Sequence, residues 1–169
     1  MMSAPPDAED PAGLESASKV IELAIAEHHT TIATAESCTG GLLGAALTAV
    51  PGSSAVYLGG VVSYSNSVKQ SLLGVPHATL DRWGAVSPQV AAAMASSVRM
   101  LLGSAIGVGV TGVAGPGSSE RKPAGLIYVA LASGRATRIA RLGSDHGREG
   151  NRAAAVSLAL RLIMEELRV

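Results

Sequence analysis

The chain has 169 residues, and its 13 Lys and Arg balance 13 Asp and Glu, so its formal net charge at pH 7 is zero. This balance, with only 2% aromatic residues, argues against a nucleic-acid-binding protein, which needs a basic surface and stacking side chains. Hydrophobic residues make up 47% of the chain, which is long enough for one compact domain and too short for two ordinary ones.

Cellular location is also constrained by the sequence. Cys38 is the single cysteine, which excludes an intrachain disulfide. No apolar run approaches the roughly 18 residues of a membrane span, and the acidic N-terminus does not resemble a signal peptide. We therefore expect a cytoplasmic protein that binds neither membrane nor nucleic acid. Residues 1–12 are acidic and rich in proline, which predicts a disordered tail ahead of one domain at 13–169.

The first third of the domain alternates between helical and extended patterns. Residues 14–29 have a broad apolar face of helical period, and TTIATA (30–35) predicts a short buried strand. A helix is expected over 42–50. The run AVYLGGVVSY (55–64) predicts a strand whose paired glycines indicate a bulge or a close backbone approach.

The middle of the chain predicts two helices. Ser65 or Asn66 caps a short helix that contains Lys69. A loop over 75–86 then leads to an Ala-rich helix that begins at Ser87-Pro88 and ends near residue 102.

The last third predicts a strand at 105–110, a Gly- and Pro-rich loop at 111–123, a β-hairpin at 125–142 and a final helix at 148–167. Helices thus alternate with about five strands, and one late pair is antiparallel. This order predicts an α/β fold, a three-layer α/β/α sandwich on a mixed, mostly parallel sheet.

Three motifs give only weak indications of function. Gly107-x-Gly109-x-x-Gly112 resembles a dinucleotide fingerprint, but its first two glycines fall inside a strand. Ser16-x-x-Lys19 lacks the third motif of the penicillin-binding enzymes. The four histidines have no zinc-site spacing, and no metal or other cofactor is expected. Cys38 as a thiolate nucleophile at a helix start stays open beside a structural role.

Two glycine-rich turns follow strands and predict a ligand site. TAESCTGG (34–41) joins a strand to a helix, and TGVAGPG (111–117) follows another strand end. Backbone N–H groups at such turns bind anions, so together they favour a nucleotide or phosphorylated ligand, although each could be structural. Lys69 is one of only three lysines. Its place in the first turn of a helix and its partial burial should lower its pKa, which would make it a general base for a serine near the start of the preceding strand.

The sequence resembles the CinA C-terminal domain family over about residues 14–167. The segments that carry this resemblance are TAESCTGG (34–41), PGSSAVYLGGVVSYSNSVKQSLLGV (51–75), GAVS (84–87), TGVAGP (111–116) and KPAGLIYVALA (122–132). The domain that precedes this one in full-length CinA proteins, which resembles molybdopterin-binding domains, is not expected here.

Standalone members of the family include nicotinamide-nucleotide amidases of bacterial pyridine-nucleotide recycling. The resemblance therefore implies hydrolysis of the carboxamide of nicotinamide mononucleotide to nicotinate mononucleotide and ammonia, by a Ser-Lys dyad with an acyl-enzyme. A homo-oligomer is also expected, although the Ala-rich helix could equally pack internally. Two alternatives stay open: a nucleotide-binding accessory protein without turnover, and an amidase for a related substrate.

The resemblance also implies the site residues. The family's serine and lysine fall on Ser54 and Lys69, and its tyrosine falls on Tyr64, near enough to polarise either. An arginine pair that opens the last helix in a Gly-Asp-Arg pattern falls on Arg148 and Arg152, and the Asp of this pattern is displaced or lost here. The phosphate is expected at the helix start after residue 37 or at the arginines. The predicted substrate-binding residues are Ser37, Thr39, Gly40, Gly41, Thr111, Gly112, Arg148 and Arg152.

Overall fold

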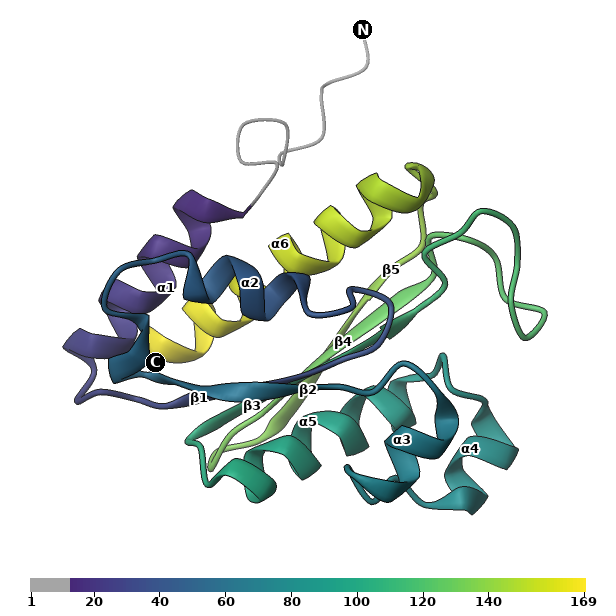
Figure 1. Cartoon of the computed structure of the whole chain (residues 1–169), viewed down its shortest axis with the longest axis horizontal. Helices are drawn as coiled ribbons and strands as arrows, with labels where there is room; N and C mark the ends of the chain where they lie inside the picture. The colour runs from purple at the N-terminus through teal and green to yellow at the C-terminus, as the bar shows by residue number, and fades with distance from the viewer. Residues whose placement is uncertain (1–12) are drawn as a thin grey trace, which may run out of the picture.

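A computed structural model describes residues 13–169 (Figure 1). The predicted tail at 1–12 lies outside the described residues. Twelve elements follow one another in the described chain, including one 3-10 turn, Ser53–Ala55.

The centre of the fold is one five-stranded sheet in the order β2-β1-β3-β4-β5. β1 pairs in parallel with β2 and β3, and β4 pairs antiparallel with β3 and β5, so that four strands share one direction. The predicted α/β class and mixed, mostly parallel sheet are confirmed. The strands are β1 (Ile32–Glu36), β2 (Tyr57–Val62), β3 (Ile106–Gly112), β4 (Ile127–Ala132) and β5 (Thr137–Leu142).

Helices cover both faces of the sheet and complete three layers (Figure 1). One face carries α1 (Leu14–Ala26), α2 (Leu42–Thr48) and α6 (Gly147–Leu167). The other face carries α3 (Asn66–Ser71), α4 (His77–Trp83) and α5 (Pro88–Leu102).

The small residues of α5 are used for packing inside the domain. Ala91 and Ala95 are fully buried against Ala130 and Ala132 of β4. The start of α5 follows the predicted signals, since the Ser87 hydroxyl accepts a hydrogen bond from the N–H of Val90. The predicted homo-oligomer stays a prediction.

Gly107 and Gly109 allow α5 to lie close to β3. A Cβ added at Gly107 would lie 2.2 Å from the carbonyl oxygen of Ala95, and one at Gly109 would lie 2.4 Å from that of Ala91. Both glycines are thus explained by helix–sheet packing, in agreement with the weak support for a dinucleotide fingerprint in the sequence.

The structure departs from the sequence prediction over 75–86, where α4 replaces most of the expected loop. Leu80 is the one buried side chain of this helix, and His77 pairs with Asp81 one turn away. A seven-residue helix with one buried side chain leaves no visible periodicity. The predicted bulge in β2 is confirmed by a register shift between Ile32 and Ala33 of β1.

The topology creates a crevice at the carboxyl ends of β1 and β3. From β1 the chain passes along one face of the sheet to β2, and it then returns along the other face to β3 on the opposite side of β1. Open α/β sheets bind their ligands at such a switch point.

Candidate active site

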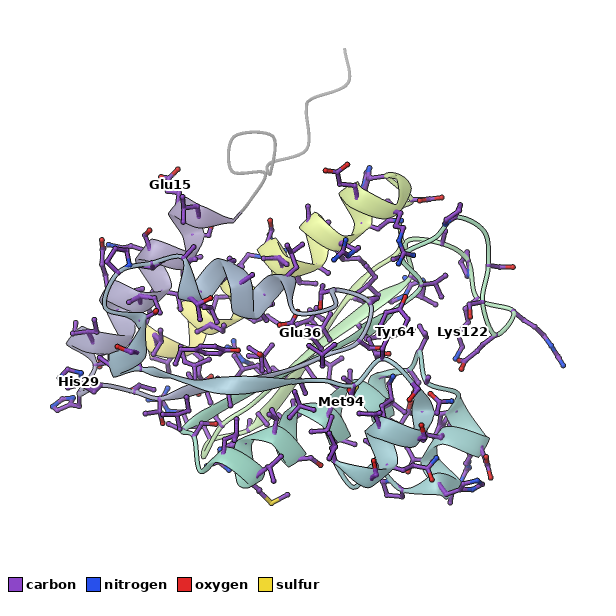
Figure 2. The ribbon with its side chains drawn as sticks, viewed as in Figure 1. Glu15, His29, Glu36, Tyr64, Met94 and Lys122 are labelled. Carbon is purple, nitrogen blue, oxygen red and sulfur yellow. The ribbon has the colours of Figure 1, made fainter. Side chains whose placement is uncertain are left out.

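A pocket of about 370 Å³ lies at this crevice. Its walls come from the segments that follow β1, β2 and β3 and from the start of α6. Figure 2 shows Glu36 and Tyr64 in this part of the molecule, with Lys122 on the long loop beyond them. The lining residues that bear on chemistry are Ser37, Cys38, Tyr64, Lys69, Thr111, Glu120 and Arg148.

Lys69 is buried at the bottom of this site, with 1% of its surface exposed. Its Nζ lies 2.7 Å from the carbonyl oxygen of Ser63, 3.2 Å from that of Tyr64 and 3.0 Å from Oγ of Ser37. Burial lowers the pKa of Lys69 below its ordinary 10.5. The predicted direction and the predicted effect of burial are confirmed, whereas the expected effect of the helix N-terminus is not among the causes, since Lys69 is the fourth residue of α3.

These three contacts fit an ammonium, which would donate to all three oxygens, and they also fit a neutral amine. A neutral amine has two N–H donors and one lone pair, so it can donate to the carbonyls of Ser63 and Tyr64. The lone pair is then left for the hydroxyl proton of Ser37. The arrangement is that of a nucleophile beside its general base.

The sheet ladder fixes the position of Ser37. Its N–H donates to the carbonyl of Val110 at 2.9 Å, and the N–H of Ser63 donates to the carbonyl of Glu36 at 2.8 Å. The ends of the three parallel strands are therefore tied together around Ser37, which is buried on the pocket wall.

The structure does not bring Ser54 to Lys69. Ser54 is exposed in the 3-10 turn before β2, whereas Lys69 binds the chain after β2 ends. The six extended residues of β2 separate the two by about 20 Å at roughly 3.3 Å per residue. The predicted Ser54–Lys69 pair is therefore wrong, because it joins opposite ends of one strand.

The start of α2 is not free to bind a phosphate. The Glu36 carboxylate, 2% exposed, accepts hydrogen bonds from the backbone N–H groups of Gly41, Leu43 and Gly44 at 2.8–3.0 Å. These are the donors that a helix start would offer to an anion. The predicted phosphate site at this helix start is wrong, since a carboxylate of the chain itself fills it.

The two predicted arginines lie one turn apart on α6, but they have different neighbours. Arg148 lines the pocket and donates to the carbonyl of Gly115 at 2.6 Å and the hydroxyl of Tyr64 at 3.3 Å. Arg152 does not line it and donates to the carbonyl of Thr39 at 2.9 Å. Tyr64 thus meets Lys69 through its carbonyl oxygen and Arg148 through its hydroxyl.

An aspartate also contributes to the start of this helix. Asp145, just before α6, accepts hydrogen bonds from Asn151 and from the N–H of Gly147, and these bonds lower its pKa. Asn151, which is buried, in turn donates to the carbonyl of Ala114 on the pocket loop.

Among the remaining predicted residues, Thr111 and Gly112 line the pocket, whereas Thr39, Gly40 and Gly41 form the turn behind it. The Thr111 hydroxyl donates to the carbonyl of Ala85 at 2.8 Å. Burial is the largest influence on Cys38 and raises its pKa to about 12, which argues against a thiolate nucleophile.

Within residues 13–169 no group of three or more His, Cys, Asp or Glu is placed to hold a metal ion. In the same residues no helix is long and apolar enough to cross a membrane.

The sequence matches the CinA C-terminal domain over residues 14–167. The chain belongs to this family. A CinA-like protein of Synechococcus sp. RCC307 is 48% identical over 156 residues, which cover 90% of this chain and 37% of that protein. A CinA-like protein of Synechococcus sp. CC9902 is 51% identical over 139 residues, covering 80% and 33% respectively. The chain spans about a third of the length of these curated relatives.

Solved structures of the CinA superfamily have the same fold. The competence/damage inducible protein CihA of Agrobacterium tumefaciens is 37% identical, with a TM-score of 0.87 and full coverage of both chains. A CinA superfamily protein of Klebsiella pneumoniae is 32% identical, with a TM-score of 0.89, covering 94% of this chain and 98% of that one.

Sequence reasoning placed Ser37 in the pocket but did not pair it with Lys69. The available signal was topological, because in parallel strands the residue just after one strand lies near the residues just after its neighbour. Ser37 follows β1 directly, whereas Ser54 precedes β2. Glu120, which also lines the pocket, stands in an irregular loop whose course no sequence pattern predicted.

Proposed function

We propose that this CinA-family domain is an amidohydrolase that hydrolyses the carboxamide of nicotinamide mononucleotide, with Ser37 as nucleophile and Lys69 as general base. The observation that carries the proposal is the buried Lys69 amine at hydrogen-bond distance from the Ser37 hydroxyl, on the wall of a pocket. The substrate follows from the resemblance to nicotinamide-nucleotide amidases.

In this mechanism Lys69 Nζ accepts the hydroxyl proton while Ser37 Oγ attacks the carboxamide carbon. The resulting ammonium then donates a proton to the departing nitrogen, which leaves as ammonia. Water, deprotonated by Lys69, hydrolyses the acyl-enzyme to release the carboxylate and free Ser37.

The backbone of the turn that follows Ser37 is best placed to stabilise the oxyanion of the tetrahedral intermediate. The N–H of Ser37 is bonded to Val110, and that of Gly40 to the Ser37 carbonyl. Among the described backbone carbonyls, none accepts a hydrogen bond from the N–H of Cys38, which lines the pocket. We assign the oxyanion to this N–H group, since one such donor typically contributes about 10² to 10³ in rate.

The phosphate is assigned to Arg148. With the start of α2 filled by Glu36, Arg148 is the described arginine on the pocket wall, and a guanidinium binds phosphate through paired N–H donors. Arg152 instead holds the Thr39 carbonyl and supports the turn that carries Ser37.

Ammonia release from nicotinamide mononucleotide tests the proposal, with free nicotinamide as a second substrate and Lys69→Ala as a second protein. We expect release by the wild type alone and from the nucleotide alone. Nucleotide binding by calorimetry without ammonia release would instead make this domain a binding module. Equal turnover of a phosphate-free substrate would make it a different amidase.

A further inference from the structure

The pocket carries charges of both signs. Of its lining residues, Lys69, Glu120 and Arg148 have acidic or basic side chains. Beside the buried Lys69 amine, the wall presents one carboxylate, from Glu120, and one guanidinium, from Arg148. Such a wall suits a ligand that itself carries both a positive and a negative group.

Two backbone N–H groups hold the carboxylate of the exposed Glu120 in this wall. Its Oε1 accepts a hydrogen bond from the N–H of Ala85 at 3.1 Å, and its Oε2 accepts one from Val86 at 3.4 Å. Burial alone would raise its pKa, but these bonds and the nearby Lys122 outweigh burial and lower it. The group is therefore ionised at neutral pH.

Lys122 approaches this carboxylate from outside the pocket. Its Nζ lies 3.4 Å from Oε2 of Glu120, and it donates to the carbonyls of Trp83 at 2.9 Å and Val86 at 2.6 Å. Because Lys122 is not among the lining residues, it fixes the carboxylate in position without entering the pocket.

Glu120 also lies toward the reacting end of the pocket. The N–H of Ala85 donates to Glu120, and the carbonyl of Ala85 accepts a hydrogen bond from the hydroxyl of Thr111. The residue before Thr111 is Val110, whose carbonyl accepts the hydrogen bond from the N–H of Ser37. The charge of Glu120 also acts on the pKa of Lys69, which it raises. In a pyridine carboxamide the ring is bonded directly to the carbon that Ser37 attacks, so a substrate with its carboxamide at Ser37 has its ring in the same pocket as this carboxylate.

We propose that Glu120 is a specificity-determining residue, whose carboxylate selects a positively charged ring beside the carboxamide over the same ring in neutral form. The quaternary pyridinium ring of the substrate proposed above is thus favoured at Glu120, while its anionic group lies toward Arg148. This inference rests on the proposed function.

Nicotinamide mononucleotide and its reduced dihydropyridine form are matched probes, because they share ribose, phosphate and carboxamide and differ in ring charge. Calorimetry measures the dissociation constants of both ligands for two variants, Ser37→Ala and Ser37→Ala/Glu120→Gln. The Ser37→Ala background should hydrolyse neither ligand. We expect Ser37→Ala to bind the oxidised form at least tenfold more tightly than the reduced form. Glu120→Gln should lower this ratio about tenfold, mainly by weakening the oxidised form.

The ratio separates charge from structural damage. A distortion that weakens binding of the shared ribose, phosphate and carboxamide cancels in this ratio. Ser37→Ala/Glu149→Gln is the matched control, since Glu149 is an exposed carboxylate beside Arg148 and outside the pocket lining. This control should leave the ratio of the two dissociation constants within about twofold of its value in Ser37→Ala.

Three outcomes would overturn the inference. They are a ratio of dissociation constants that Glu120→Gln leaves unchanged, an equal loss of affinity for both ligands, and no binding of either ligand. An equal loss would place Glu120 against the shared ribose. Failure of the proposed function looks different, because the wild type would then release no ammonia while the binding ratio still depended on Glu120.

Discussion

Lys69 Nζ lies 3.0 Å from Ser37 Oγ, although the two residues are 32 positions apart in the sequence. Ser37 comes directly after β1, and Lys69 reaches back from α3 to the chain that leaves β2. The pair therefore depends on the parallel register of two strands rather than on any local motif.

Replacing Ser37 and Ser54 separately tests which serine is the nucleophile. Ser37→Ala should reduce kcat by at least about 10³-fold, because it removes the attacking oxygen. Ser54→Ala, the matched control at the far end of β2, should keep kcat/KM within about twofold. The measurement is ammonia release, with circular dichroism as the check on folding. The reverse pattern of activities would make Ser54 the nucleophile.

The pH profile should report the titration of Lys69. Because the base is the neutral amine, kcat/KM should rise with pH and level off at the lowered pKa of Lys69, below 10.5. Lys69→Arg should be inactive across the range, since a guanidinium stays protonated. A rate that keeps rising up to pH 10.5 would contradict a lowered pKa.

The same shift has a consequence for stability. The native state loses the Lys69 proton at a lower pH than the unfolded chain does. Between the lowered pKa and 10.5 the unfolded chain binds more protons. The contribution of this group to the free energy of unfolding should therefore rise with pH in that window.

Cys38→Ala should keep kcat within about threefold of the wild type. With a pKa raised to about 12, the thiol stays protonated at neutral pH and should also resist alkylation by iodoacetamide. Activity assays and mass spectrometry of the treated protein check both expectations. Rapid alkylation of Cys38 with loss of activity would support the hypothesis that Cys38 is a thiolate nucleophile.

Glu36→Ala should lower the free energy of unfolding by about 2–4 kcal/mol, because three backbone donors of the α2 start lose their acceptor. Urea denaturation with an unchanged m-value is the measurement. The control is Glu22→Ala, which removes an exposed carboxylate paired with Lys19 on α1 and should cost less than about 0.5 kcal/mol. Equal losses of stability in the two variants would mean that the hydrogen bonds of Glu36 to the start of α2 contribute nothing specific to stability.

Gly109→Ala should destabilise the fold by about 1–3 kcal/mol, since the added methyl would have to push α5 away from β3. Gly134→Ala is the matched change, because a Cβ there would meet nothing closer than 3.8 Å. Thermal unfolding of the two variants compares them. A tolerated alanine at Gly109 would reopen the question of why this motif is glycine.

The sequence alone predicted most of the elements, because their signals are local. The β-branched run before Glu36, the Ser87-Pro88 start of α5 and the hairpin turn at Ser133-Gly134 each depend on neighbouring residues. α4 was missed because its single buried leucine leaves no period to detect.

The sequence also identified Lys69, the two glycine-rich turns and the family to which the chain belongs. It could not determine which serine meets Lys69 or that Glu36 fills the helix start with its own carboxylate. It could not place Glu120 on the pocket wall either. These relationships join segments that only strand order and register bring together, and the electrostatics follow from that burial. Local chemistry therefore predicted which residue types act here, whereas the tertiary structure decided which of them meet.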